Sequence, residues 1–197
     1  LTVNPIPAAP TAENYGPICV GYTLNLSAST ITGATYTWTG PDNFNSSSQT
    51  PSRPNATTAY SGIYTVRVTV AGCVSTASAT IATVMANPAP TATNNGPICA
   101  GGTLALSAST ITDATYSWTG PNGFVSTNQN PSISYATTAA SGTYALAVTV
   151  NGCTGNSSTA VTINPSPYVV DQPTNWIAIV GSSAKFSVVA GGTGPLH

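Results

Sequence analysis

The sequence predicts an all-β protein built from tandem β-sandwiches that together form an elongated rod. The chain matches itself at an offset of 80 residues, and 44 of the 70 residues from 9 to 78 are identical in the second copy. Apolar and polar side chains alternate with a period of two, as in half-buried strands, and no helical stripe is present. Short strands about ten residues apart, separated by turn-forming residues, are typical of a sandwich.

The repeated motifs define the units. Gly-Pro-Ile-Cys at 16–19 recurs at 96–99, and Val-Thr-Val at 68–70 recurs at 148–150. Asn-Pro-x-Pro begins at Asn4, Asn87 and Asn164, and its paired prolines favour extended, semi-stiff linkers. We expect four segments: the tail of a preceding unit (1–3), repeat 1 (4–86), repeat 2 (87–163), and the start of a third, incomplete unit (164–197).

The alternation places the strands of each repeat. In repeat 1, Leu24, Leu26 and Ala28 lie on one face of a strand, and the alternating residues 64–70 form a longer one. In repeat 2, residues 144–150 show the same alternation, and Gly-Pro-Asn-Gly at 120–123 is a strong turn signal.

The composition excludes several classes of function. Only 4% of the 197 residues are charged, whereas an ordinary globular protein has about 25%, and the net charge is −1. We therefore expect no nucleic-acid partner, and no apolar run is long enough for membrane insertion. The single histidine, His197, is the last residue, so acid–base and nucleophilic catalysis lack their usual groups. We expect no enzyme activity, no metal site and no cofactor.

Several residues carry a resemblance to immunoglobulin-like (Ig-like) domains. Ser-Gly-x-Tyr at 61–64 and 141–144 resembles the tyrosine corner of that fold, and the segment from Gly21 to Ala28 resembles its strand B. The cysteine motifs resemble Ig-like and PKD-like repeats of large secreted or cell-surface adhesins of Bacteroidetes, including gliding-associated proteins. The resemblance implies structural core positions for the following residues: Trp38, Trp118, Tyr64 and Tyr144.

The four cysteines suggest disulfides in an extracellular or cell-surface protein. In the fold that the resemblance implies, Cys19 precedes Ala28 in strand B by nine residues and Cys73 follows Val66 in strand F by seven, which places them at opposite ends. We therefore favour an inter-domain bond between Cys19 and Cys153, with Cys73 and Cys99 bonded to neighbouring units. Bonds within each repeat, Cys19–Cys73 and Cys99–Cys153, or free thiols are the alternatives.

The expected role is a non-catalytic structural module of an adhesin stalk or an extracellular filament, with neighbouring repeats or copies of the same chain as partners. The alternative is a carbohydrate-binding or spacer module of a secreted protein. Tyr15, Tyr22 and Tyr60 are the candidate binding residues for surface glycans, since repeat 2 replaces all three and such variation suggests exposure.

Overall fold

The computed structural model describes residues 4–172, 177 and 179–192. The predicted tail of a preceding unit at 1–3, together with Trp176 and His197, lies outside these residues. The chain divides into two compact units. The first comprises Leu1–Pro88 with Asn151–Cys153, and the second comprises Ala89–Val150 with Thr154–His197. A three-residue turn of repeat 2 therefore belongs to the first unit.

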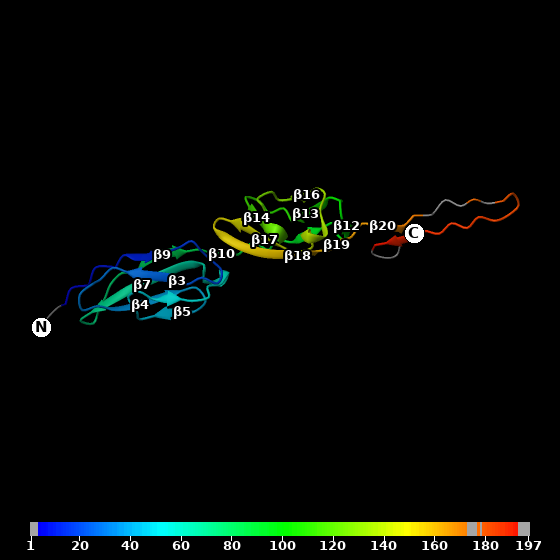
Figure 1. Ribbon diagram of the computed structural model, residues 1–197. Coiled ribbons are helices and arrows are strands. Elements are labelled where there is room, and N and C mark those ends of the chain that lie inside the picture. Colours follow the sequence, from blue (N-terminus) through cyan, green and yellow to red (C-terminus); the bar gives the residue numbers. More distant parts are fainter. Residues whose placement is uncertain (1–3, 173–176, 178, 193–197) are drawn as a thin grey trace. The chain divides into compact units, whose positions relative to one another are not determined.

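Two antiparallel sheets and one short parallel pair form the first unit, coloured blue to green in Figure 1. One sheet has the order β1 (Ala12–Asn14), β3 (Leu24–Ala28), β6 (Ser52–Arg53). The other has the order β5 (Phe44–Ser46), β4 (Thr35–Gly40), β7 (Gly62–Val70), with β8 (Cys73–Val74) and β9 (Ser78–Ala82) both paired to β7. The parallel pair is β2 (Ile18–Cys19) with β10 (Val84–Met85). One 3₁₀ turn, η1 (Thr58–Tyr60), precedes β7.

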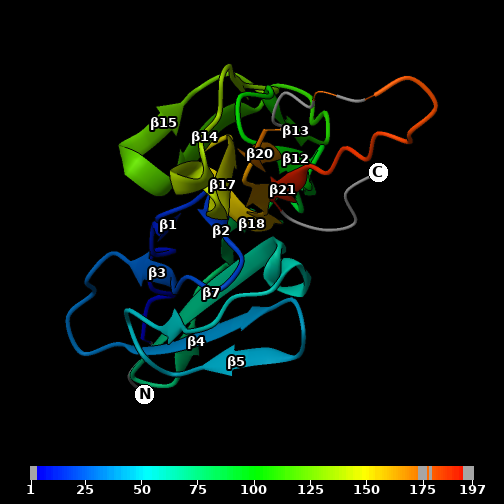
Figure 2. The ribbon, with the colours of Figure 1, turned by 45° about the vertical axis from the view of Figure 1, so that its right-hand side comes forward.

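The second unit repeats this topology, and its strands β14, β15 and β17 are labelled in Figure 2. One sheet has the order β11 (Ala92–Asn94), β13 (Leu104–Ala108), β16 (Ser132–Ile133). The other has the order β15 (Phe124–Ser126), β14 (Thr115–Gly120), β17 (Gly142–Val150), β18 (Cys153–Val161). The parallel pair is β12 (Ile98–Cys99) with β19 (Ile163–Asn164). The 3₁₀ turns are η2 (Pro121–Gly123) and η3 (Thr138–Ala140).

Each sandwich buries the apolar side of its alternating strands. In β3 the side chains of Leu24, Leu26 and Ala28 are buried while the residue between the two leucines is exposed, because successive strand residues point to opposite faces. The counterpart strand β13 has the same pattern. Each unit has its own core, centred on one tryptophan and one tyrosine that are fully buried: Trp38 and Tyr64, or Trp118 and Tyr144. The predicted all-β sandwiches are thus confirmed.

Two local features differ from the expected strands. Strand B was expected from Gly21, but β3 begins at Leu24, and Cys19 lies on the separate strand β2. The last long strand of repeat 2, β18, is continuous, whereas its counterpart in repeat 1 is divided into β8 and β9. Buried Ser75 lies in that interruption, where its hydroxyl accepts a hydrogen bond from the Val68 amide at 3.1 Å and donates one to the Thr76 carbonyl. The hydroxyl therefore bonds a buried amide that the divided strand leaves free.

Beyond β19 the described chain forms one antiparallel pair, β20 (Tyr168–Asp171) with β21 (Val189–Gly191). All four residues of β20 are exposed. The start of a third sandwich at 164–197 stays a prediction.

Candidate functional site

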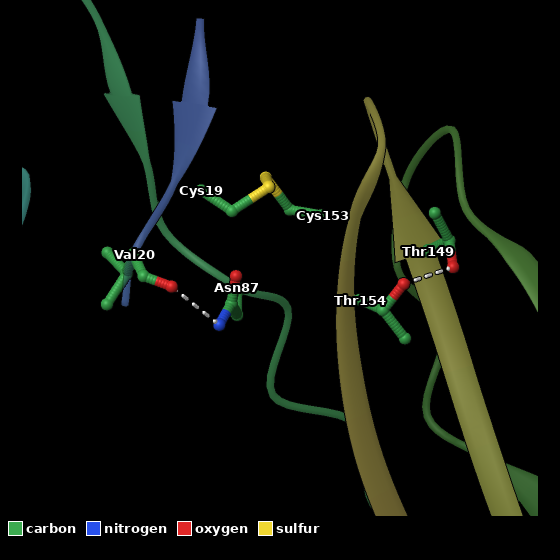
Figure 3. Close-up of a disulfide and its surroundings, with 6 residues drawn as sticks. All are labelled: Cys19, Val20, Asn87, Thr149, Cys153 and Thr154. Atoms are coloured by element: carbon green, nitrogen blue, oxygen red, sulfur yellow. Dashed lines mark hydrogen bonds between the residues drawn. A yellow bond between two sulfur atoms is a disulfide. The ribbon is translucent and has the colours of Figure 1, made fainter. Parts of the chain in front are cut away.

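A disulfide joins Cys19 on β2 to Cys153, the first residue of β18, across 134 residues of sequence (Figure 3). The two Cα atoms are 5.5 Å apart, within the normal range for a disulfide. Beside it, the Asn87 side-chain amide donates a hydrogen bond to the Val20 carbonyl at 3.4 Å, drawn in Figure 3. This is the pairing favoured on the sequence, and it links residues from both repeats.

The strand register of the first unit explains why Cys19 does not bond to Cys73. Cys19 pairs with Met85. Met85 lies three residues beyond Ala82, and Ala82 pairs with Gly62, the first residue of β7. Cys19 therefore lies near the start of β7. Cys73 pairs with Val70 at the other end of β7. The nine residues of β7 extend roughly 25 Å, several times the Cα separation that a disulfide allows. The alternative bond within repeat 1 is therefore wrong, and so is a Cys99–Cys153 bond, because Cys153 is already used.

The other two cysteines, Cys73 and Cys99, are free thiols in the described part of the chain. We call Cys19 and Cys99 the strand cysteines, since they end β2 and β12, and Cys73 and Cys153 the turn cysteines, since each follows a tight turn. Cys99 is exposed, and Cys73 is half-buried with its sulfur 3.5 Å from the Asn4 carbonyl oxygen. Their expected bonds to neighbouring units remain a proposal.

The aromatic core residues lie where the resemblance implied. The Tyr64 hydroxyl donates to the Tyr60 carbonyl at 2.8 Å and the Tyr144 hydroxyl to the Ala140 carbonyl at 2.9 Å, as in a tyrosine corner. Burial raises the pKa of Tyr144; it also raises the pKa of Tyr64, an effect that the hydrogen bond and charge of Arg53 oppose. These tyrosines, like the two core tryptophans, are fully buried.

The expected exposure of Tyr60 is wrong. Its ring is partly buried against the first core, and the Arg53 guanidinium carbon lies 3.5 Å from the ring centroid. Arg53 also donates hydrogen bonds to the Tyr64 hydroxyl at 2.6 Å and to the Asp42 carboxylate at 3.2 Å. This cluster was not predicted from the sequence, although a signal existed: repeat 2 replaces Arg53 and Tyr60 together, with Ile133 and Ala140.

Tyr15 and Tyr22 are exposed as expected, with 66% and 67% of their surface accessible. Tyr22 also lines a cavity of about 240 Å³ beside the disulfide, together with Pro17, Ile18 and Gly152. A larger cavity of about 390 Å³ lies at the other end of the first sandwich, next to the turn of Cys73. Its walls are formed by Asn4, Pro5, Pro7, Ala8, Ile31, Thr32, Val70 and Ala71. Neither cavity contains a charged side chain among its lining residues.

Within the described ranges, no histidine, cysteine and carboxylate side chains gather into a group able to hold a metal ion. The helices among these residues are three-residue 3₁₀ turns, none of which is long and apolar enough to cross a membrane.

The sequence matches no family model and no curated protein. The structure is similar to the N-terminal eight Ig domains of Down Syndrome Cell Adhesion Molecule, with a TM-score of 0.59 and 15% identity over 92% of this chain. The chain spans 28% of the length of that eight-domain chain. An I-band fragment of titin matches with a TM-score of 0.46 and 12% identity, covering 94% of this chain and 77% of the fragment. The three N-terminal domains of the Highly Immunogenic Outer Capsid protein of bacteriophage RB49 match with a TM-score of 0.45 and 18% identity. This match covers 95% of this chain and 69% of that chain.

At these identities the likeness shows the fold alone. The chain consists of tandem Ig-like β-sandwiches, as the tyrosine corners and the strand order also indicate. Such sandwiches support many functions, so the role of this chain has to be argued from its own residues.

Proposed function

We propose that this chain is a non-catalytic structural module of an extracellular or cell-surface protein, such as an adhesin stalk or an extracellular filament. The Cys19–Cys153 disulfide carries the proposal, because it links residues of the two repeats covalently. A bond that closes a loop of more than 100 residues stabilises a fold by about 4–5 kcal/mol on chain-entropy arguments. Disulfides persist in oxidising environments, which supports a location outside the cell.

The surface chemistry supports a mechanical role. Only 4% of the residues are charged, so few groups on the surface titrate. Contacts between such surfaces change little with salt or pH.

Single-molecule stretching tests the mechanical proposal. Force applied to the two ends of the oxidised chain bypasses the loop between Cys19 and Cys153, so these residues do not extend. The fully stretched length is then shorter than that of the Cys19→Ser/Cys153→Ser variant by roughly 450 Å, at about 3.4 Å per residue. The Cys73→Ser/Cys99→Ser variant is the matched control and keeps the short length. Equal lengths for the native chain and the Cys19→Ser/Cys153→Ser variant would show that no bond shields the loop.

Labelling of intact source cells tests the location. A membrane-impermeant amine reagent has Lys185 as a target, and a surface chain is labelled before the cells are lysed. Labelling that appears only after lysis contradicts an extracellular role.

A carbohydrate-binding module is the second candidate, and exposed Tyr22 favours it. Its ring lines the cavity beside the disulfide, and aromatic rings commonly stack on sugars. Repeat 2 has Gly102 at this position, so binding would belong to repeat 1 alone. Saturable binding on a glycan panel that Tyr22→Ala abolishes and Tyr135→Ala leaves intact is the expected result, since Tyr135 is an exposed tyrosine of repeat 2 that lies outside this cavity. No binding across the panel removes this candidate.

A further inference from the structure

We propose that Cys99 of one copy of this chain forms a disulfide with Cys73 of a second copy, so that copies join head to tail. The inference rests on the proposed structural function and names the partner. The Cys19–Cys153 bond pairs a strand cysteine with the turn cysteine of the repeat that follows it. Cys99 and Cys73 are the remaining strand cysteine and turn cysteine, and both are free.

The surroundings of Cys99 reproduce those of Cys19. Ile98–Cys99 pairs in parallel with Ile163–Asn164, as Ile18–Cys19 pairs with Val84–Met85. The residue after each strand cysteine donates a backbone hydrogen bond to the carbonyl of the last residue of the partner strand. The distance is 2.9 Å from the Val20 amide to the Met85 carbonyl and 2.8 Å from the Ala100 amide to the Asn164 carbonyl. The Val20 carbonyl also accepts a hydrogen bond from the Asn87 side chain, and the Ala100 carbonyl accepts one from the Ser166 hydroxyl. The half of the bond that Cys19 supplies is therefore present a second time, with an exposed thiol.

The turn that presents Cys73 reproduces the turn that presents Cys153. Ala71 and Gly72 have φ angles of 46° and 81°, and Asn151 and Gly152 have 49° and 82°. Positive φ at two successive residues fixes the same tight turn in both repeats. The half that Cys153 supplies is present a second time too.

The partner of Cys99 has to supply a turn cysteine like Cys153. The turn cysteine of this sequence that is left unbonded is Cys73. Association of copies meets little electrostatic resistance because the net charge is −1. A second copy carries the required turn at Cys73 with an unpaired thiol.

The bond forms by exchange with a small-molecule disulfide such as oxidised glutathione. The Cys99 thiolate attacks one glutathione sulfur, which breaks the glutathione disulfide and releases one reduced glutathione. The Cys73 thiolate of the second copy then attacks the Cys99 sulfur of the mixed disulfide and releases a second reduced glutathione. The two cysteines are oxidised, one glutathione disulfide is reduced to two thiols, and the two cysteine protons end on the glutathione thiols.

The test uses the 197-residue chain, with Cys73 and Cys99 reduced, in a buffer of oxidised and reduced glutathione. A non-reducing gel is expected to show a ladder of multiples of the chain mass, which collapses on full reduction. In peptide maps, the Cys73–Cys99 bond is expected to exceed the two like pairs by about tenfold, because matched surfaces raise the effective concentration of the correct pair. Mixing ¹⁵N-labelled with unlabelled chain identifies bonds between copies.

Two variants complete the test. Cys73→Ser and Cys99→Ser each leave the chain mainly monomeric, because each lacks one half of the pair, and mixing the two variants gives a dimer joined through Cys99 and Cys73. Retention of the Cys19–Cys153 peptide in each variant shows that the fold is intact. Three results overturn the proposal. They are a native chain that stays monomeric, a Cys73–Cys99 bond within one copy, and a yield of the Cys73–Cys99 bond no higher than random pairing gives. The proposed function fails separately, if native chain lacks the Cys19–Cys153 bond.

Discussion

The two repeats fill the space beside the tyrosine corner in different ways. In repeat 1 the buried Arg53 lies between aromatic rings, with its guanidinium carbon 4.8 Å from the Phe44 centroid and 3.5 Å from that of Tyr60. In repeat 2 the corresponding residues are Ile133 and Ala140, which pack against or within the second core. The same backbone therefore accepts either a hydrogen-bonded cation or a small apolar set.

The partners of Arg53 change together with it. Asp42, whose carboxylate accepts a hydrogen bond from the guanidinium at 3.2 Å, corresponds to Asn122 in repeat 2. Asn122 instead donates to the Ala139 carbonyl at 3.0 Å. The difference teaches that the Ig-like frame does not require the cation, but the repeat that buries one surrounds it with hydrogen-bond acceptors, among them the Tyr64 hydroxyl and the Asp42 carboxylate.

Replacement of Arg53 is expected to give the largest effect. Arg53→Ala removes its contacts with the aromatic rings and its hydrogen bonds, and lowers the stability of repeat 1 by about 3 kcal/mol. Ile133→Ala, at a partly buried site, lowers that of repeat 2 by about 2 kcal/mol. Hydrogen exchange resolved by peptide measures each repeat separately. A smaller loss for Arg53→Ala than for Ile133→Ala would contradict the comparison.

The triple variant Asp42→Asn, Arg53→Ile, Tyr60→Ala, which gives repeat 1 the residues of repeat 2, is the matched control and recovers most of the loss.

The two tyrosine hydroxyls are expected to differ next. Tyr64 accepts a hydrogen bond from Arg53 in addition to donating one, whereas Tyr144 donates one to Ala140. Bonds to charged groups contribute more, so Tyr64→Phe costs about 2 kcal/mol and Tyr144→Phe about 1 kcal/mol. Denaturant titrations read by the same exchange method compare them. Equal losses would show that the Arg53 bond adds nothing.

Alkaline pH gives a third contrast. The pKa values of Tyr64 and Tyr144 are raised in the folded chain, in both cases mainly by burial. The folded state therefore retains these protons longer than the unfolded state. Stability is unaffected below about pH 10 and falls as pH rises above it, by at most about 1.4 kcal/mol per unit for each tyrosine. Tyr64→Phe is expected to reduce the alkaline loss of stability in repeat 1 only, and Tyr144→Phe in repeat 2 only. If the pH dependence of stability is unchanged in both variants, these tyrosines are not its source.

The smallest expected contrast concerns the two tryptophans. The indole nitrogen of Trp118 donates to the Gln129 carbonyl at 3.2 Å, whereas the buried nitrogen of Trp38 has no hydrogen-bond partner among the described residues. Trp118→Phe therefore costs about 1 kcal/mol more than Trp38→Phe, since it alone loses a hydrogen bond. Thermal unfolding of each variant, followed by exchange, checks this. The reverse order would indicate a partner for Trp38.

The fold could be predicted from the sequence because its signals are local and repeated. The alternation at 64–70 and the recurrence at 80 residues determine the strands and their number of copies. The favoured cysteine pairing depended only on which end of the fold each cysteine occupies. The short strand β2 was missed because two residues show no periodicity, and its pairing with β10 depends on residues 66 positions away.

The candidate site was predicted less completely. Tyr60 was expected to be exposed because repeat 2 replaces it, yet variation between repeats also arises where two buried neighbours change together. The Ser75 interruption shows the same limitation, since a buried serine that bonds a strand amide has no signature in composition. Contacts between distant residues determine both, and a single sequence does not display them.

The Cys19–Cys153 bond also changes what a protease can do to this chain. The backbone from residue 19 to residue 153 and the disulfide together form a closed covalent ring. One cleavage anywhere inside it opens the ring without separating the two pieces. The exposed turns of both repeats lie inside the ring, so a single nick in any of them leaves the molecule whole until the disulfide is also reduced.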